Sequence, residues 1–305
     1  MHEELLDLAR TVGAEAAALL MDRPPAFEIE EKTTAIDIVT QMDKKAETFI
    51  VQSILAVRPD DGMIGEEGAD IESKSGITWV IDPLDGTVNY FYGLPGWNVS
   101  IAAKDRDGSV VGVVTAPTIN STWWATRGGG AFFNGSKIKV NEPVEFDRAF
   151  IGTGFQYDVS HRLRQIENVG RMLPLIRDIR RNGAAAVDIC SVAMGSLDAY
   201  FEDGLKEWDW AASSLVATEA GAKFGLYGQA PYMTTLATVE NLALELPEHQ
   251  RATLAMHILD SLPGLFSEPD GGLAEAKRRD AELDDNPSMG LTLAEFDQKI
   301  LSRRT

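Results

Sequence analysis

The run Ile77-Thr78-Trp79-Val80-Ile81 constrains the fold most, because it is apolar at consecutive positions and stops abruptly at Asp82. Such a run is typical of a strand buried on both faces of a sheet. Pro83 has no N–H to give to a strand ladder, so we expect the strand to end there. Asp85-Gly86 predicts a turn, and Thr87 favours the start of a helix. Two carboxylates at one such turn repel each other unless a cation lies between them, although ordinary turn chemistry explains each one alone.

Composition excludes several other classes of protein. The chain has 305 residues, and its hydrophobic share of 44% is that of a soluble globular protein with one large domain or two. No segment reaches the roughly 20 apolar residues of a membrane span. The first residues are acidic, which argues against a signal peptide, and residues 5–20 have the spacing of an amphipathic helix. The single cysteine, Cys190, lies in an apolar run and excludes an internal disulfide, so we expect a cytoplasmic protein.

The net charge of −19 disfavours nucleic acid and anionic membranes as partners. It would also repel a phosphorylated substrate, unless cations bound at the site reverse the local sign. The four histidines are scattered, so a histidine-built metal site is not expected. Any metal should be a hard ion with oxygen ligands, namely Mg²⁺, Mn²⁺ or Ca²⁺.

The patterns divide the chain into three parts. Residues 1–147 predict an α+β half that ends in antiparallel strands over 97–140. Residues 148–232 predict a second half, with a strand near 150, a helix over 161–181 kinked at Pro174, a helix followed by a strand over 184–204, and an apolar helix after Asp209. Residues 233–305 predict a helical tail.

Several acids occupy equivalent places in these patterns. Glu66, Asp82, Asp85 and Asp209 each lie where an apolar strand ends or a helix begins, and Asp43 lies in the first turn of a helix. A cap or a solvated surface explains any one of them. Together they predict a shared crevice in which carboxylates bind Mg²⁺, the metal activates water, and the backbone at the turn before Thr87 holds a phosphate. The sequence therefore predicts metal-assisted hydrolysis of a phosphate ester.

Three segments make a specific family resemblance. GEE at 65–67, WVIDPLDGTVNYFYGLP at 79–95 and EWDWAASSLVATEAGA at 207–222 resemble the signature segments of the inositol monophosphatase family, a lithium-sensitive, Mg²⁺-dependent superfamily that includes fructose-1,6-bisphosphatases. The resemblance covers about residues 1–228. It implies a layered αβαβα sandwich of the α+β class, a homodimer, and two or three Mg²⁺ ions for which Mn²⁺ can substitute.

The resemblance also implies a role for each matching position. Metal ligands would be Glu66, Asp82, the Leu84 carbonyl, Asp85 and Asp209. Asp43 and the Thr87 hydroxyl would orient and activate the attacking water, and Glu66 would belong to the catalytic residues as well as to the metal ligands. The backbone N–H groups of Gly86 and Thr87 would hold the phosphate. The remaining substrate positions would be Lys32, Gly183, Ala184, Ala185 and Glu202.

The tail departs from that family. Residues 233–305 resemble small helical addiction-module proteins, which are antitoxin-like, and a fused module of that kind would bind a protein partner. The alternative is that LPEHQRATLAMHILDSL is the phosphatase's own terminal helix, followed by a solvated segment. If the family's closing strand is missing, a sheet edge is left for the tail or a partner to cover.

The expected activity is hydrolysis of a small polyol or sugar phosphate by metal-activated water in an in-line attack, with inositol monophosphate as the first candidate. Fructose 1,6-bisphosphate, histidinol phosphate and 3′-phosphoadenosine phosphate are alternatives, and a bisphosphate would favour extra basic residues such as Arg180 and Arg181. A different class of function is a regulatory protein that acts through its tail.

Overall fold

The structure, a computed structural model, describes residues 2–31 and 38–226. The chain divides into two compact units, residues 1–230 and 231–305, and the described residues all belong to the first. The tail expected at 233–305 and the candidate Lys32 lie outside the described residues. Predictions about the tail therefore remain predictions.

An eight-stranded sheet forms the centre of the described unit. Its strand order is β10-β9-β8-β7-β6-β5-β3-β4. The bounds are β3 Gly62–Gly65, β4 Asp70–Ile71, β5 Thr78–Asp85, β6 Asn98–Asp105, β7 Gly108–Ala116, β8 Ser121–Thr126, β9 Gly130–Phe133 and β10 Ser136–Ile138. The antiparallel run expected over 97–140 is confirmed in β6 to β10.

Strand β5 is buried along its length from Trp79, as the unbroken apolar run predicts. It pairs parallel to β3 and antiparallel to β6. The prediction that it ends before Pro83 is wrong. The register with β6 shifts between Asp82 and Asp85, so a bulge accommodates the proline and the strand continues to Asp85.

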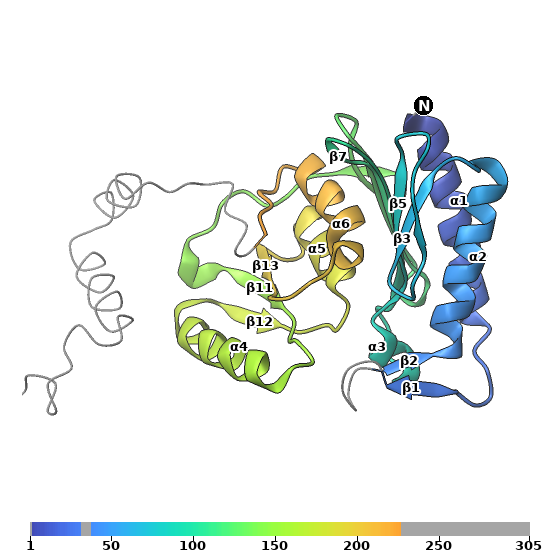
Figure 1. Cartoon of the computed structure of the whole chain (residues 1–305). Helices are drawn as coiled ribbons and strands as arrows, with labels where there is room; N and C mark the ends of the chain where they lie inside the picture. Colours follow the sequence, from blue (N-terminus) through green and yellow to red (C-terminus); the bar gives the residue numbers. More distant parts are fainter. Residues whose placement is uncertain (1, 32–37, 227–305) are drawn as a thin grey trace, which may run out of the picture. The chain divides into compact units, whose positions relative to one another are not determined.

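Helices cover both faces of this sheet (Figure 1). Helices α1 (His2–Met21) and α2 (Gln41–Val57) pack on one face, and α5 (Ala185–Ala193) and α6 (Glu207–Glu219) pack on the other. A second sheet, in the parallel order β12-β11-β13, lies beyond α5, and α4 (Val159–Met172) lies on its outer side. The strand bounds are β11 Phe150–Thr153, β12 Asp178–Arg180 and β13 Ala199–Phe201. This is the αβαβα layering that the resemblance implies.

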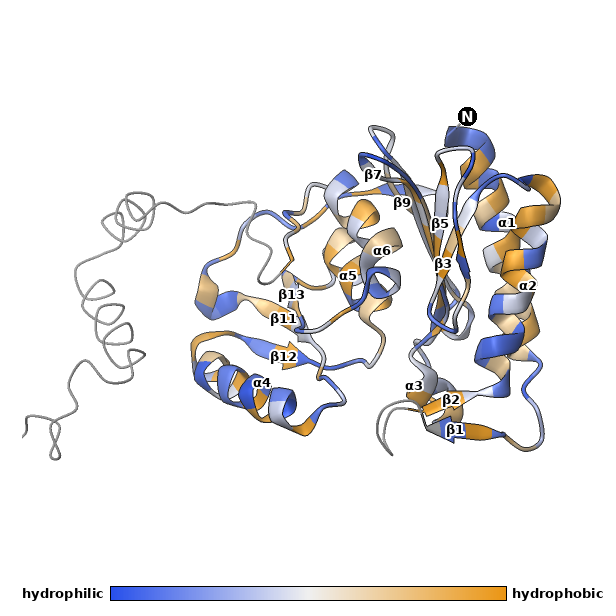
Figure 2. Ribbon diagram, viewed as in Figure 1, coloured by the Kyte–Doolittle hydropathy of each residue, from blue (hydrophilic) through white to orange (hydrophobic). Residues whose placement is uncertain are grey.

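The layers meet through small residues. Helices α5 and α6 contribute buried apolar residues to one cluster with the sheet, and much of their ribbon has the hydrophobic colour in Figure 2. Helix α6 approaches β7 so closely that a Cβ built on Gly112 would lie 2.4 Å from the Ala212 carbonyl oxygen. Gly112 therefore sets the distance between α6 and the sheet, and α6 carries Asp209 in its first turn.

The helix expected over 161–181 is only partly correct. Helix α4 begins at Val159, capped by Asp158, and ends at Met172. Pro174 lies in a 3-10 turn rather than at a kink, because its ring and missing N–H prevent the α-helix from continuing. The chain then enters β12 at Asp178, so the last part of the predicted helix is strand.

The remaining short elements lie around the turn at Asp85. They are the hairpin of β1 (Ile29–Glu31) and β2 (Ile38–Thr40) and the helix α3 (Thr87–Tyr92). Gly86, not Thr87, is the N-cap of α3, and its φ of 85° is a left-handed conformation that suits glycine. Thr87 is the first helical residue, which directs its hydroxyl toward α2.

Candidate active site

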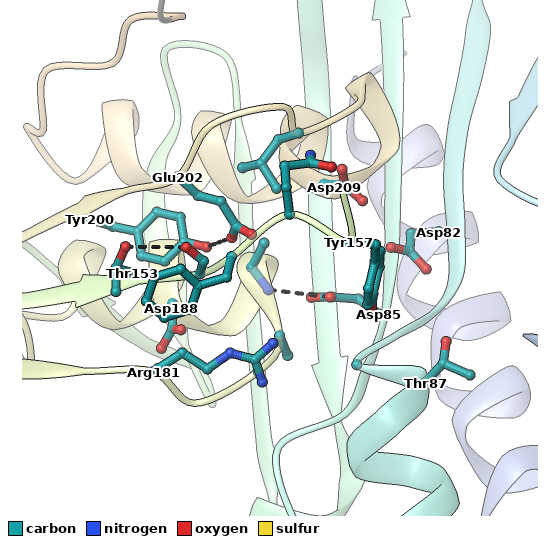
Figure 3. A pocket seen from close by; sticks show the side chains of 18 of the residues that line it. Asp82, Asp85, Thr87, Thr153, Tyr157, Arg181, Asp188, Tyr200, Glu202 and Asp209 are labelled. Carbon is teal, nitrogen blue, oxygen red and sulfur yellow. Dashed lines mark hydrogen bonds between the residues drawn. The ribbon is translucent and has the colours of Figure 1, made fainter. Parts of the chain in front are cut away.

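The pocket at the end of β5 gathers residues from both halves of the chain (Figure 3). Every predicted metal ligand lines it: Glu66, Asp82, Leu84, Asp85 and Asp209. The predicted substrate positions Gly86, Thr87, Gly183, Ala184, Ala185 and Glu202 line it as well. Topology thus brings together carboxylates that are up to 143 residues apart in the sequence, as the span from Glu66 to Asp209 shows.

Asp82 is the most deeply buried of the four predicted metal-binding carboxylates, with 2% of its surface exposed. Its carboxylate accepts a hydrogen bond from the Leu84 N–H at 3.0 Å. Burial raises the pKa of Asp82 well above its usual value, and the charges of Glu66, Asp85 and Asp209 raise it further. A hydrogen bond with Glu66 acts in the same direction. A group held in this way is stabilised by a bound cation.

Asp85 links β5 to the start of α5. Its carboxylate accepts hydrogen bonds from the Asn98 side chain at 2.8 Å and from the backbone N–H groups of Ala185 at 3.2 Å and Ala186 at 2.8 Å. Burial raises the pKa of Asp85 to about 7, although these hydrogen bonds lower it in part. Figure 3 shows the contact with α5 as a dashed line.

Asp209 lies in the first turn of α6 rather than at its N-cap, because the helix begins three residues earlier than the cap interpretation requires. Its carboxylate accepts a hydrogen bond from the Lys206 N–H. Burial raises the pKa of Asp209 well above its usual value, and the nearby charges of Asp85 and Glu66 act in the same direction. Asp209 therefore caps the N-terminus of α6 and also lines the pocket.

Buried Asp43 and half-buried Thr87 form a hydrogen-bonded pair beside the acids. The Thr87 hydroxyl lies 2.9 Å from Asp43 Oδ1 and 3.1 Å from the Leu84 carbonyl oxygen. Asp43 Oδ2 accepts hydrogen bonds from the Thr40 N–H and hydroxyl, which fix the carboxylate at the start of α2. A hydroxyl has one proton, so donation to Asp43 leaves the Leu84 carbonyl oxygen available to a cation. Burial raises the pKa of Asp43.

The far side of the pocket is polar and was only partly predicted. Glu202 accepts a hydrogen bond from the Tyr200 hydroxyl, and burial raises the pKa of Glu202 while Arg181 lowers it. Asp188 lies nearby on α5 (Figure 3), and burial raises its pKa to about 6. Sequence reasoning missed Asp188 and Tyr200. The lone acid in the apolar run AAAVDIC was the one available signal for Asp188.

The two neighbouring arginines have different surroundings. Arg181 lines the pocket, whereas Arg180 pairs with Asp178 at 2.7 Å and stacks on Phe150 with its guanidinium carbon 4.5 Å from the ring centroid. Among the described pocket-lining residues, Arg181 is the one permanently cationic side chain. It therefore has the position required to contact a second anionic group on a substrate.

The donor set fits a hard divalent cation in chemistry, because it consists of carboxylates and one backbone carbonyl. No group of three or more His, Cys, Asp or Glu side chains in the described part of the chain has its donor atoms arranged as in a complete metal site. Asp85 and Asp209 each accept a hydrogen bond from a backbone N–H in this structure. The four carboxylates nevertheless line one pocket, where burial and the charges of the neighbouring acids raise the pKa of Asp82 and Asp209.

Comparison with known proteins agrees with this arrangement. The model of the inositol monophosphatase family matches residues 1–258, so the match extends into the first part of the tail. The "Inositol-1-monophosphatase SuhB" of Mycobacterium tuberculosis is 37% identical over 239 residues, which are 72% of this chain and 82% of that protein. The "Nus factor SuhB" of Escherichia coli is 37% identical over 226 residues, 72% of this chain and 84% of that protein.

Solved structures show the same fold. The extragenic suppressor protein suhB of Bartonella henselae superposes with a TM-score of 0.68 at 33% identity, covering 72% of this chain and 85% of that one. The IMPase of Thermotoga maritima superposes with a TM-score of 0.65 at 35% identity, covering 72% of this chain and 84% of that one. The chain belongs to the inositol monophosphatase family.

None of the helices over residues 2–31 and 38–226 is long and apolar enough to cross a membrane.

Proposed function

We propose that this chain is a Mg²⁺-dependent phosphomonoesterase that hydrolyses a small polyol or sugar phosphate, with inositol monophosphate as its first candidate substrate. The observation that carries the proposal is the convergence of four buried or half-buried carboxylates on one pocket beside the Asp43–Thr87 pair. Carboxylates packed in this way repel an anionic substrate unless cations are bound among them.

Glu66, Asp82, Asp85, Asp209 and the Leu84 carbonyl would hold the metal, two ions at the centre of the site and a third at Glu66, with Mn²⁺ as a substitute. Bound Mg²⁺ would neutralise the phosphate and lower the pKa of bound water. The backbone N–H groups of Gly86 and Thr87 would bind a phosphate oxygen. The Thr87 hydroxyl would accept a proton from the attacking water as its own proton passes to Asp43, over the 2.9 Å hydrogen bond that joins them.

The far side of the pocket would bind the alcohol part of the substrate. Glu202 would accept hydrogen bonds from substrate hydroxyls, and the Gly183–Ala185 segment would form a wall with no bulky side chains. Arg181 favours the bisphosphate alternatives, which are fructose 1,6-bisphosphate and 3′-phosphoadenosine phosphate. Histidinol phosphate remains a further candidate, because its amino group would face Asp188 or Glu202.

Phosphate release from these four classes of substrate, each with Mg²⁺ and with EDTA, tests the proposal. We expect turnover of at least one substrate with Mg²⁺ and none with EDTA. Asp82→Asn should lower turnover about a thousandfold or more, because it removes a carboxylate from the centre of the cluster. Near-normal turnover by that variant would contradict the site assignment. Li⁺ at millimolar concentration should inhibit if a metal site resembles that of the family.

A regulatory role is the alternative of another class. Some relatives are called Nus factors, and the tail at 233–305 could engage a protein partner, as could the homodimer that the family resemblance implies. A folded protein that releases no phosphate from any substrate with Mg²⁺, but that retains a specific partner through its tail in a pull-down, would favour this alternative. Loss of the partner on deletion of residues 233–305 is the control.

A further inference from the structure

Asn98, the first residue of β6, is a fully buried polar side chain that contacts Asp85. The two residues lie opposite each other in the β5–β6 pairing, at the end of the bulge that begins at Asp82. The bulge therefore decides that Asn98 faces Asp85, because a shift of one position would turn the amide to the other side of the sheet. Asn98 is not among the described residues that line the pocket, so any effect it has on a bound ligand passes through Asp85.

The side-chain amide of Asn98 forms one hydrogen bond within the described part of the chain, and the acceptor is Asp85. Its Nδ2 lies 2.8 Å from Asp85 Oδ2, while its Oδ1 is a buried atom without a hydrogen-bond partner. An unpaired buried acceptor costs about 1–3 kcal/mol, so folding alone would favour an apolar side chain at this position. The contact with Asp85 is the interaction that accounts for an amide here.

The two carboxylate oxygens of Asp85 have different surroundings. Oδ2 accepts hydrogen bonds from the Asn98 amide and from the Ala186 N–H, each at 2.8 Å. Within the described residues, Oδ1 accepts one longer hydrogen bond, from the Ala185 N–H at 3.2 Å. Each carboxylate oxygen offers about two lone-pair directions. Both directions of Oδ2 are therefore occupied, and Oδ1 keeps one direction for a cation.

We propose that Asn98 is a positioning residue that makes Asp85 bind metal through Oδ1 alone and thereby favours Mg²⁺ over Ca²⁺. Mg²⁺ requires near-octahedral geometry at about 2.0–2.1 Å, whereas Ca²⁺ takes roughly six to eight oxygens and accepts bidentate carboxylates. A carboxylate with one oxygen held by the protein suits Mg²⁺ and withholds the second oxygen that Ca²⁺ can use. The inference rests on the proposed function, because it takes Asp85 as a metal ligand.

The test is calorimetric titration of the full chain with Mg²⁺ and with Ca²⁺, without substrate, after metal has been removed with EDTA and dialysis. Asn98→Leu keeps the branched shape of the side chain and removes the donor. We expect it to weaken Mg²⁺ binding about 10- to 100-fold, the usual cost of losing a group that orients a metal ligand. Ca²⁺ binding should weaken less than about threefold, because Asp85 can then turn its second oxygen to the ion.

Thr115→Val is the matched control. Thr115 lies on the neighbouring strand β7, is buried, and also has a polar atom without a hydrogen-bond partner. Its hydroxyl lies beside Gly13 of α1, whereas Asp85 contacts α5 on the other face of the sheet. Both dissociation constants of Thr115→Val should therefore equal those of the parent protein.

Asn98→Ala is a second variant, which removes the donor without adding bulk and should show the same loss of preference for Mg²⁺. Melting temperatures in EDTA identify the variants that fold. An unchanged preference for Mg²⁺ in a folded Asn98 variant, or equal weakening of both ions, would overturn this inference and leave the proposed function standing. Absence of saturable Mg²⁺ binding by the parent protein, or Mg²⁺ binding that Asp82→Asn leaves unchanged, would overturn both.

Discussion

At the scale of single residues, the pocket contains one arginine whose role can be separated from that of its neighbour. Arg181 lines the pocket, while Arg180 is already paired with Asp178 and stacked on Phe150. Arg181→Ala should lower kcat/KM for a bisphosphate about 10- to 100-fold, the value of one charge-assisted hydrogen bond. For inositol 1-phosphate the expected loss is below threefold.

Arg180→Ala is the matched control. Its kcat/KM for the bisphosphate and for inositol 1-phosphate should stay near the values of the parent enzyme. Steady-state kinetics on the two substrates provides the measurement. Equal losses for the mono- and bisphosphate in Arg181→Ala would show that this guanidinium does not recognise a second anionic group.

Asp188 makes stability depend on pH. Its folded pKa is raised to about 6 by burial, so its neutral form is favoured in the folded state. The contribution of this group to stability is therefore fully present below pH 4 and is lost as pH rises through 6, with a total of about 3 kcal/mol. Asp188→Asn removes the titration and still accepts the hydrogen bond from Asn182.

Urea unfolding of both proteins at pH 4 and pH 8 measures this effect. The free energy of unfolding of Asp188→Asn, relative to the parent protein, should be higher at pH 8 than at pH 4. An identical difference at the two pH values would mean that folding does not raise the pKa of Asp188.

At the scale of elements, the contact between α6 and β7 positions Asp209. Gly112→Ala would place a methyl group 2.4 Å from the Ala212 carbonyl oxygen, so α6 has to move away from the sheet. We expect a loss of about 1–3 kcal/mol in the free energy of unfolding, and a fall in kcat, because the helix carries a proposed metal ligand.

Gly170→Ala is the control for this substitution. Gly170 lies within α4, and nothing is within 4 Å of a Cβ built there. This change should stabilise the protein by about 0.5–1 kcal/mol and leave kcat unchanged. Chemical denaturation and kinetics on both variants separate the effect of helix position from that of a methyl group alone.

Helix and strand types were largely predictable, because the apolar periodicity is regular in α1, β5 to β8 and α5. The errors fall at prolines. At Pro83 a bulge in the pairing with β6 lets the strand continue, and at Pro174 the helix stops and a strand follows. Both outcomes depend on pairing with another strand, β6 at Pro83 and β11 after Pro174, and the pattern around each proline does not encode that pairing.

At the scale of the whole molecule, metal binding should couple to folding. The candidate ligands come from the end of β3, from β5 and from α6, so bound Mg²⁺ would tie the sheet to the helical layer. At 100 times its dissociation constant, Mg²⁺ should add about 2.7 kcal/mol of stability, or roughly 5–10 °C in Tm for a domain of this size.

Differential scanning calorimetry with Mg²⁺ and with EDTA measures this coupling, with NaCl at matched ionic strength as the control for screening. Asp82→Asn should be more stable than the parent protein in EDTA, because it removes one of several repelling charges. It should gain less than half as much from Mg²⁺. An equal gain in both proteins would exclude Asp82 as a ligand.

The sequence by itself determined the chemical types at the site and the order of the layers. Carboxylates at strand ends and helix starts are a local pattern, and DPLDGT and EWDWAA are specific enough to identify the family. The tertiary structure decided which residues meet. It places Arg181 rather than Arg180 in the pocket, adds Asp188 and Tyr200, and brings Asn98 against Asp85. These depend on contacts between residues far apart in the chain, which no local pattern encodes.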